Sequence, residues 1–209
     1  MLSLTPDWPW VTVVLLGAFH GINPAMGWLF AVGLGLQEGR RSAVLAALVP
    51  LGLGHAVSVG AVILALDAAR LAVAPGVLRI VAAAALIGFG LFRLIRPWAH
   101  PRWVGMQVGF RDLTLWSFLM SSAHGAGLML APVVLGLPSH HGEVHRGSLA
   151  GGLALLGLHT LAMFAVMGLV AVVVYQVLGL GLLRRAWVNL DLLWAVALLL
   201  AGVATLWMG

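Results

Sequence analysis

The stretch AFHGINPAMGW, residues 18–28, lies inside an apolar run that is long enough to cross a membrane. It places a histidine, an asparagine and a proline where a bilayer holds least water. Polar residues are energetically costly there, so they mark a candidate functional site. A second stretch, SAHGAGLMLAPVVLGL at residues 122–137, again has His-Gly, then a methionine, a nearby proline and a closing Leu-Gly-Leu. The similarity of the two stretches suggests an internal repeat.

A second pair of histidines supports the repeat. His55 lies in LGLGHAVSVG, and His159 lies in the similar stretch LLGLHTLAMF. His20 precedes His55 by 35 residues, and His124 precedes His159 by 35 residues, so both pairs are offset by 104 residues, about half of the 209-residue chain. We therefore predict a first repeat at residues 1–104 and a second at residues 105–209.

Composition indicates an all-α integral membrane protein. Apolar residues make up 62% of the chain and charged residues only 8%, whereas a soluble domain has roughly 25% charged residues. Each repeat holds three apolar runs, and because three is odd, the second repeat enters the membrane from the opposite side. The sequence predicts six transmembrane helices as two inverted three-helix repeats, at about residues 11–35, 42–66, 77–95, 114–137, 148–175 and 188–208.

The arginines predict the orientation. The connections between spans 1 and 2, spans 3 and 4, and spans 5 and 6 hold eight arginines, and the opposite side holds three. The eight are Arg40, Arg41, Arg93, Arg96, Arg102, Arg111, Arg184 and Arg185. Both termini are therefore expected to face outward from the cytoplasmic (inner) membrane. The net charge of +5 is therefore attributed to topology and not to a nucleic-acid surface. The chain has no cysteine, which excludes disulfides and thiolate metal sites. The lipid bilayer is the expected partner, and the sequence leaves open whether the chain forms a homo-oligomer.

The four repeat histidines fall near the predicted midpoints of four spans, within about three residues or about 5 Å along a helix. Neutral imidazole is a common transition-metal ligand, and methionine sulfur favours Cu(I). We expect His20, His55, His124 and His159 to converge as metal ligands, with Met26 and Met129 as soft ligands. Copper is slightly favoured over zinc, nickel, cobalt and iron. The predicted auxiliary residues are Asn23, Ser58, Ser121, Met120 and Met163.

Two further segments bear on how an ion would reach such a site. Gly17, Gly21, Pro24 and Gly27 predict a break near the centre of the first span, because proline lacks an N–H and disturbs the preceding helical turn. Broken spans are tolerated in membranes where they line a cavity. The segment SHHGEVH, with His140, His141, Glu143 and His145, is either a metal-capture loop on the outer face or an ordinary polar loop.

At these residues the chain resembles the NicO-type nickel/cobalt permeases of the lysine-exporter superfamily. That family carries a motif of the form His-Ala-Phe-Asp-Ala-Asp-His in an early helix, and HGINPAM occupies the same frame. His20 matches the first histidine, Asn23 and Ala25 stand at the two aspartates, and Met26 stands at the second histidine. GLGHAVS at His55 is similar to a later family motif. The resemblance implies a metal-ion permease, and the loss of both acids favours a softer or less charged ion than nickel or cobalt.

Three alternatives use the same histidines. Four histidines on four helices could ligate haem in an electron-transfer protein, with Gly21 and Gly125 leaving room for a porphyrin. A histidine-bound metal with an open position could make the protein an intramembrane metalloenzyme. In a metal-free carrier, the histidines would form hydrogen bonds or relay protons. The sequence predicts no catalytic residues beyond the histidines, so the leading hypothesis is a metal-ion transporter.

Overall fold

The computed structural model describes residues 8–95, 109–136, 144–178 and 190–207, and the regular elements in these ranges are all helical. The expectation of an all-α chain is therefore confirmed for the described residues. The elements are α1 (Trp8–Ile22), the 3-10 turn η1 (Pro24–Met26), α2 (Trp28–Glu38), α3 (Arg41–Ala72), α4 (Pro75–Ile95), α5 (Phe110–Ala123), the 3-10 turn η2 (Leu128–Leu130), α6 (Ala131–Gly136), α7 (Val144–Val173), the π-helical turn η3 (Val174–Leu178) and α9 (Leu190–Trp207).

Several helices are long and apolar enough to span a membrane. Three qualify singly within the described ranges: Arg41–Ala72, Pro75–Ile95 and Ala150–Val177. A fourth span results if Phe110–Ala123 and Leu128–Gly136 count as one bent helix. Pro9–Ile22 and Trp194–Trp207 are apolar but shorter. These lengths support a membrane protein with three or four clear spans, fewer than the six that the sequence predicts.

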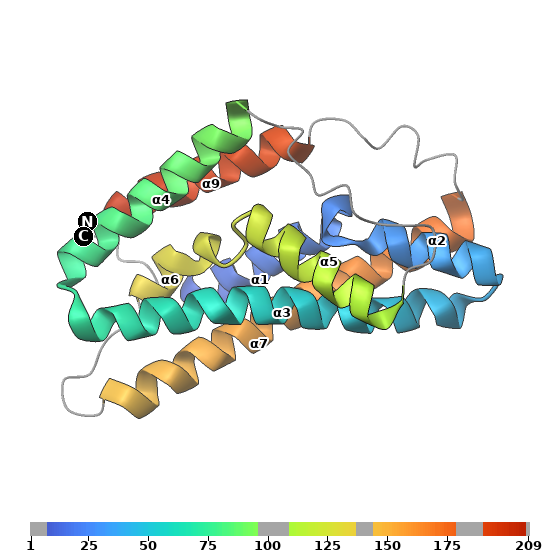
Figure 1. Ribbon diagram of the computed structural model, residues 1–209, viewed down its shortest axis with the longest axis horizontal. Coiled ribbons are helices and arrows are strands. Elements are labelled where there is room, and N and C mark those ends of the chain that lie inside the picture. Colours follow the sequence, from blue (N-terminus) through green and yellow to red (C-terminus); the bar gives the residue numbers. More distant parts are fainter. Residues whose placement is uncertain (1–7, 96–108, 137–143, 179–189, 208–209) are drawn as a thin grey trace.

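The helices pack in two groups (Figure 1). α1 packs along α7, α3 packs along α5, and α3 and α7 also pack against each other. α4 and α9 run side by side as a separate pair, which meets the other helices mainly near η2 and α6. Apolar side chains cover both the inner contacts and much of the outer surface, as expected for helices that face lipid.

The first predicted span is broken where the sequence places Pro24. α1 ends at Ile22, the turn η1 follows, and α2 begins at Trp28. The Asn23 side chain accepts a hydrogen bond of 2.9 Å from the Ala25 amide, and Pro24 is the first residue of the turn, where its missing N–H costs nothing. Gly27 has φ +109°, a conformation that side chains rarely adopt. The predicted break is confirmed.

The fourth predicted span is also broken, which corrects the expectation of a continuous helix over residues 114–137. α5 ends at Ala123, and its direction differs by 52° from that of the segment beginning at Leu128. Gly125 in the intervening turn has φ +68°. The Trp194 indole N–H donates to the His124 main-chain oxygen, so a carbonyl freed by the break has a partner. The partner lies 70 residues away, beyond what local sequence patterns show.

Substitution of Gly27 by alanine is expected to destabilise the fold more than substitution of Gly39. Both glycines have positive φ, at +109° and +65°, and such conformations cost about 1–3 kcal/mol for other residues. A Cβ at Gly27 would also meet the Leu51 side chain at 2.5 Å, whereas one at Gly39 would meet nothing within 4 Å. We expect Gly27→Ala to lower the free energy of unfolding by about 2 kcal/mol more than Gly39→Ala. Thermal unfolding in detergent measures the difference, and equal melting temperatures would contradict the described turn.

Candidate site at the buried histidines

Three of the four repeat histidines meet in the core. His20 comes from α1, His55 from α3 and His159 from α7, and each ring is 1% exposed or less. Their ring centroids are 4.9 Å apart for His20 and His159, 5.3 Å for His20 and His55, and 5.3 Å for His55 and His159. The three imidazoles are thus in mutual contact, and we call them the histidine cluster.

The hydrogen bonds at Nδ1 indicate the tautomer of two cluster rings. His20 Nδ1 lies 2.6 Å from the Leu16 main-chain oxygen, and His159 Nδ1 lies 3.4 Å from the Val13 main-chain oxygen. A carbonyl oxygen only accepts, so both Nδ1 atoms donate. In a neutral imidazole the other nitrogen then carries a lone pair. The Nε2 atoms of His20 and His159 are therefore lone-pair donors of the kind that a metal uses.

The third ring of the histidine cluster, that of His55, forms hydrogen bonds through both of its nitrogens. His55 Nε2 lies 3.2 Å from His159 Nε2, and because the latter carries a lone pair, His55 Nε2 donates. His55 Nδ1 then accepts from the Ser121 hydroxyl, at 2.8 Å. The Nε2 atom of His20 is buried and has no hydrogen-bond partner. It is one of few such orphaned side-chain atoms among the described residues.

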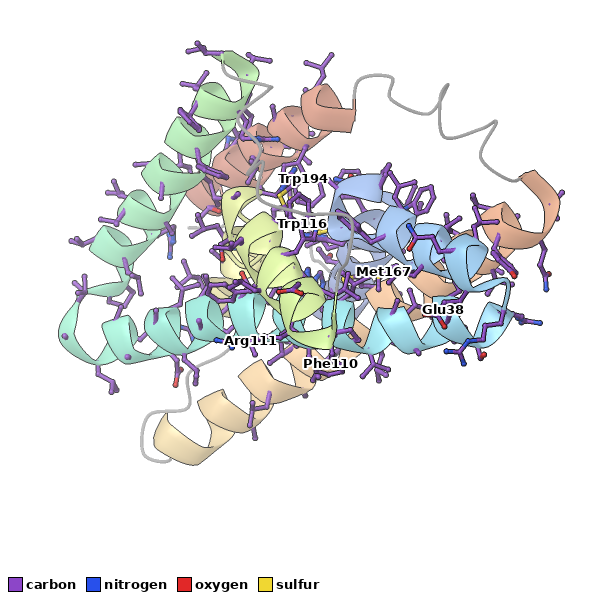
Figure 2. All side chains as sticks on the ribbon, turned by 45° about the vertical axis from the view of Figure 1, so that its right-hand side comes forward. Glu38, Phe110, Arg111, Trp116, Met167 and Trp194 are labelled. Atoms are coloured by element: carbon purple, nitrogen blue, oxygen red, sulfur yellow. The ribbon has the colours of Figure 1, made fainter. Side chains whose placement is uncertain are left out.

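The fourth histidine, His124, hydrogen-bonds to partners outside the histidine cluster. His124 Nδ1 donates to the Met120 main-chain oxygen at 2.8 Å, and its Nε2 accepts from the Arg93 guanidinium at 3.3 Å. The indole of Trp194 stands edge-on against both His124 and His20, with ring centroids 5.4 Å and 4.6 Å away. Figure 2 shows Trp194 where α9 approaches α1. The structure therefore brings three of the predicted ligands together and places the fourth beside an arginine.

Arg93 is a buried residue of this site that the sequence pattern does not predict. The pattern predicts it as a topology signal in a connection, but it lies in the last turn of α4 and is 1% exposed. The buried residues of α4 lie on one helical face, and Arg93 follows Leu86 and Gly90 on that face at spacings of four and then three residues. The same series is visible in the sequence and could have placed Arg93 on the buried face.

The auxiliary residues divide into those near the histidines and those engaged elsewhere. Ser121 bonds directly to His55. Asn23 caps η1 through its side chain, and Ser58 bonds to Ser122 at 2.9 Å. The four methionines assigned to the site are all buried, at 2% exposure or less: Met26, Met120, Met129 and Met163.

The predicted metal-capture loop lies largely outside the described residues. His140, His141 and Glu143 precede the start of α7 at Val144. His145 lies in the first turn of α7, in a part of the helix whose side chains are not described. The alternatives of a metal-capture loop and an ordinary polar loop both stay open.

As the side chains stand, no three His, Asp or Glu residues within the described ranges form a group that could hold a metal ion. The Nε2 of His55 would have to lose its proton before it could serve as a ligand. Among the carboxylates with described side chains, Asp67 lies about three helical turns along α3 from His55. Asp112 accepts from the Gly109 amide, and Glu38 accepts from Arg40. What the cluster offers is two uncharged lone pairs and a third nitrogen that needs a tautomer change.

Comparison of the chain with family models, with curated proteins and with solved structures gives no match.

Proposed function

We propose that the chain binds a transition-metal cation at the histidine cluster and carries it across the membrane. The observation that supports this most is the buried, unpartnered Nε2 of His20. A buried polar atom without a partner costs about 1–3 kcal/mol, so native structures rarely leave one without a reason. A metal bound by His20 and its two neighbours would give this lone pair a partner.

The spacing of the nitrogens fits such an ion. Metal–nitrogen bonds of about 2.0–2.1 Å at tetrahedral angles separate two ligand nitrogens by about 3.3–3.4 Å. His55 Nε2 and His159 Nε2 are already 3.2 Å apart. A metal could therefore replace the proton between them with little movement of α3 or α7. The Nδ1 hydrogen bonds to Leu16 and Val13 would hold the rings in the orientation that ligation requires.

The uncharged ligand set favours a soft cation of low charge. Histidine neutralises none of the charge of an ion, and uncompensated charge is expensive in a membrane core. Cu(I) carries one charge and binds imidazole and thioether ligands well. Met26 and Met129 are buried near the two helix breaks and could serve as soft ligands along the route. We therefore favour Cu(I), with zinc, nickel, cobalt and iron as the other ions to be tested.

Equivalent contacts support the six-span inverted repeat that the transport proposal assumes. His55 and His159 are 104 residues apart and contact each other, as residues do when they lie on a two-fold axis. The packing of α1 on α7 corresponds to that of α5 on α3, and the two third helices, α4 and α9, pack together. Breaks follow His20 and His124 at equivalent positions. In this proposal α1 with α2, and α9, complete the six spans, and both termini face outward.

The packing weighs against haem. A Cβ at Gly21 would meet the Met163 main-chain oxygen at 2.5 Å, and one at Gly125 would meet the Phe89 ring at 3.0 Å. The space beside these glycines is thus filled by neighbouring helices and not left for a porphyrin. A porphyrin between His55 and His159 would also need their Nε2 atoms about 4 Å apart, since each metal–nitrogen bond is about 2.0 Å.

Metal analysis of protein purified in detergent, without chelator or affinity tag, tests the proposal. We expect about one metal ion per chain after loading with Cu(I), and uptake of that ion into liposomes that contain the protein. A bound metal without uptake would support a metalloenzyme instead. A porphyrin absorption band would establish the haem alternative. Failure of Cu(I), Zn(II), Ni(II), Co(II) and Fe(II) to bind would leave a metal-free carrier.

A further inference from the structure

His55 differs from the other three buried histidines in the partner of its Nδ1 atom. Main-chain oxygens of Leu16, Val13 and Met120 accept from the Nδ1 atoms of His20, His159 and His124. The Nδ1 atom of His55 instead faces the hydroxyl of Ser121 at 2.8 Å. A carbonyl oxygen only accepts, whereas a serine hydroxyl can donate or accept. Three rings are thus held as Nδ1–H tautomers, and one ring is free to be either.

We infer that Ser121 is a positioning residue that allows His55 to reverse its tautomer when a metal binds the histidine cluster. The inference rests on the proposed function. With the rings as they lie, His55 is the Nε2–H tautomer, because its Nε2 donates to the lone pair of His159. A metal needs that nitrogen without its proton.

The reversal leaves the charge of the ring unchanged. One N–H bond breaks at Nε2 and one forms at Nδ1, so His55 holds a single proton before and after. The new Nδ1–H then donates to the Ser121 oxygen, and the serine proton can turn to a carbonyl of the preceding helical turn. A main-chain carbonyl in the place of Ser121 would disfavour the metal-free arrangement, and alanine would leave the metal-bound Nδ1–H without an acceptor.

The arrangement also gives the three ligands an order. His20 presents an unpartnered lone pair, so an incoming ion meets it at no cost in hydrogen bonds. His159 must exchange the proton of His55 for the ion, and His55 must change its tautomer. Ligation by His55 therefore comes last and closes the site around the ion.

Nitrogen-15 NMR of protein labelled at histidine tests the tautomer in the absence of metal. We expect His55 to show the Nε2–H pattern and His20, His124 and His159 to show the Nδ1–H pattern, with each signal assigned by its loss in a single His→Asn variant. Addition of Cu(I), which is diamagnetic, should convert His55 to the Nδ1–H pattern. It should shift the Nε2 signals of His20 and His159 without changing their tautomer and leave His124 unchanged. An Nδ1–H pattern for His55 in metal-free protein would overturn the inference.

A matched pair of serine variants tests the role of Ser121. Loss of a hydrogen-bond partner behind a metal ligand typically weakens metal binding about 10- to 100-fold, and we expect this for Ser121→Ala. Its His55 should stay Nε2–H at Cu(I) concentrations that convert the unmodified protein. Ser122→Ala is the control, because Ser122 bonds to Ser58 and to the Phe118 main-chain oxygen and, within the described part of the chain, to no histidine.

The outcomes separate this inference from the proposed function. Equal Cu(I) affinities for Ser121→Ala and Ser122→Ala, with His55 converted in both, would overturn the role of Ser121 while metal binding stands. Failure of the unmodified protein to bind Cu(I), Zn(II), Ni(II), Co(II) and Fe(II) would overturn the proposed function and with it the metal-driven reversal. The spectrum of the metal-free protein would still decide the tautomer of His55.

Discussion

Replacement of His20 by alanine is expected to abolish stoichiometric metal binding. Binding energies of about 10–16 kcal/mol shared among three or four ligands assign about 4 kcal/mol to each, and that is about a 1,000-fold loss of affinity. His20 is the most informative ligand to remove, because its Nε2 has no hydrogen bond that the substitution could break. Metal content after dialysis and a Cu(I) titration measure the effect.

His124→Ala is the matched control for His20→Ala. The two histidines stand at equivalent positions of the proposed repeat, 104 residues apart, and both are buried. His124 Nε2 already accepts from the Arg93 guanidinium, whereas His20 Nε2 has no hydrogen-bond partner. We expect metal affinity within about tenfold of the unmodified protein. Equal losses of metal affinity in both variants would support a site with all four histidines as ligands. Unchanged affinity in His20→Ala would show that the histidine cluster is not the binding site.

Gly54→Ala is expected to have the largest effect on stability. Gly54 lies where α3 crosses α5, and an added Cβ would run into the Thr114 main-chain oxygen and lie 2.8 Å from the Phe118 amide. Main-chain atoms cannot relieve a clash by changing rotamer as a side chain can, so α3 and α5 must move apart. We expect a loss of about 3 kcal/mol or more in the free energy of unfolding. Thermal unfolding in detergent and the yield of monodisperse protein are the measurements.

Separation of α3 and α5 should also disturb the hydrogen bonds that position the histidine cluster. Ser117 donates to the Leu51 main-chain oxygen at 2.6 Å and Ser121 bonds to His55 across the same crossing. Gly157→Ala is the control, since a Cβ there would meet nothing within 4 Å and alanine favours helix. Its melting temperature should equal or exceed that of the unmodified protein. If Gly54→Ala melts like Gly157→Ala, the described crossing of α3 and α5 is wrong.

The features that local sequence determines were predicted correctly. Pro24 and the glycines at 17, 21 and 27 predict the break after Ile22 from local sequence, because proline disturbs the preceding helical turn and glycine adopts the positive φ found at Gly27. The common depth of the histidines follows from their positions within apolar runs. That His20, His55 and His159 meet agrees with the spacing argument, although their role as metal ligands stays a prediction.

The features that depend on long-range packing were missed. The expected continuous helix over residues 114–137 is broken at a turn whose freed carbonyl is satisfied by Trp194, 70 residues away. The same indole stands against His20 and His124. Arg93 reaches His124 from a different helix, 31 residues earlier. No periodicity within one segment reports such contacts, because they depend on how α4 and α9 approach the rest of the chain.

The lack of any negative charge among the three clustered rings has an electrical consequence. If the chain carries a cation as proposed, an ion held by neutral ligands would keep its full charge in the membrane field, and its transport would carry current. Each elementary charge gains or loses about 2.3 kcal/mol per 100 mV, which is close to a fiftyfold concentration ratio for a monovalent ion. A membrane that is negative inside would thus draw the ion inward without any coupled partner, and outward movement would need an energy source of its own.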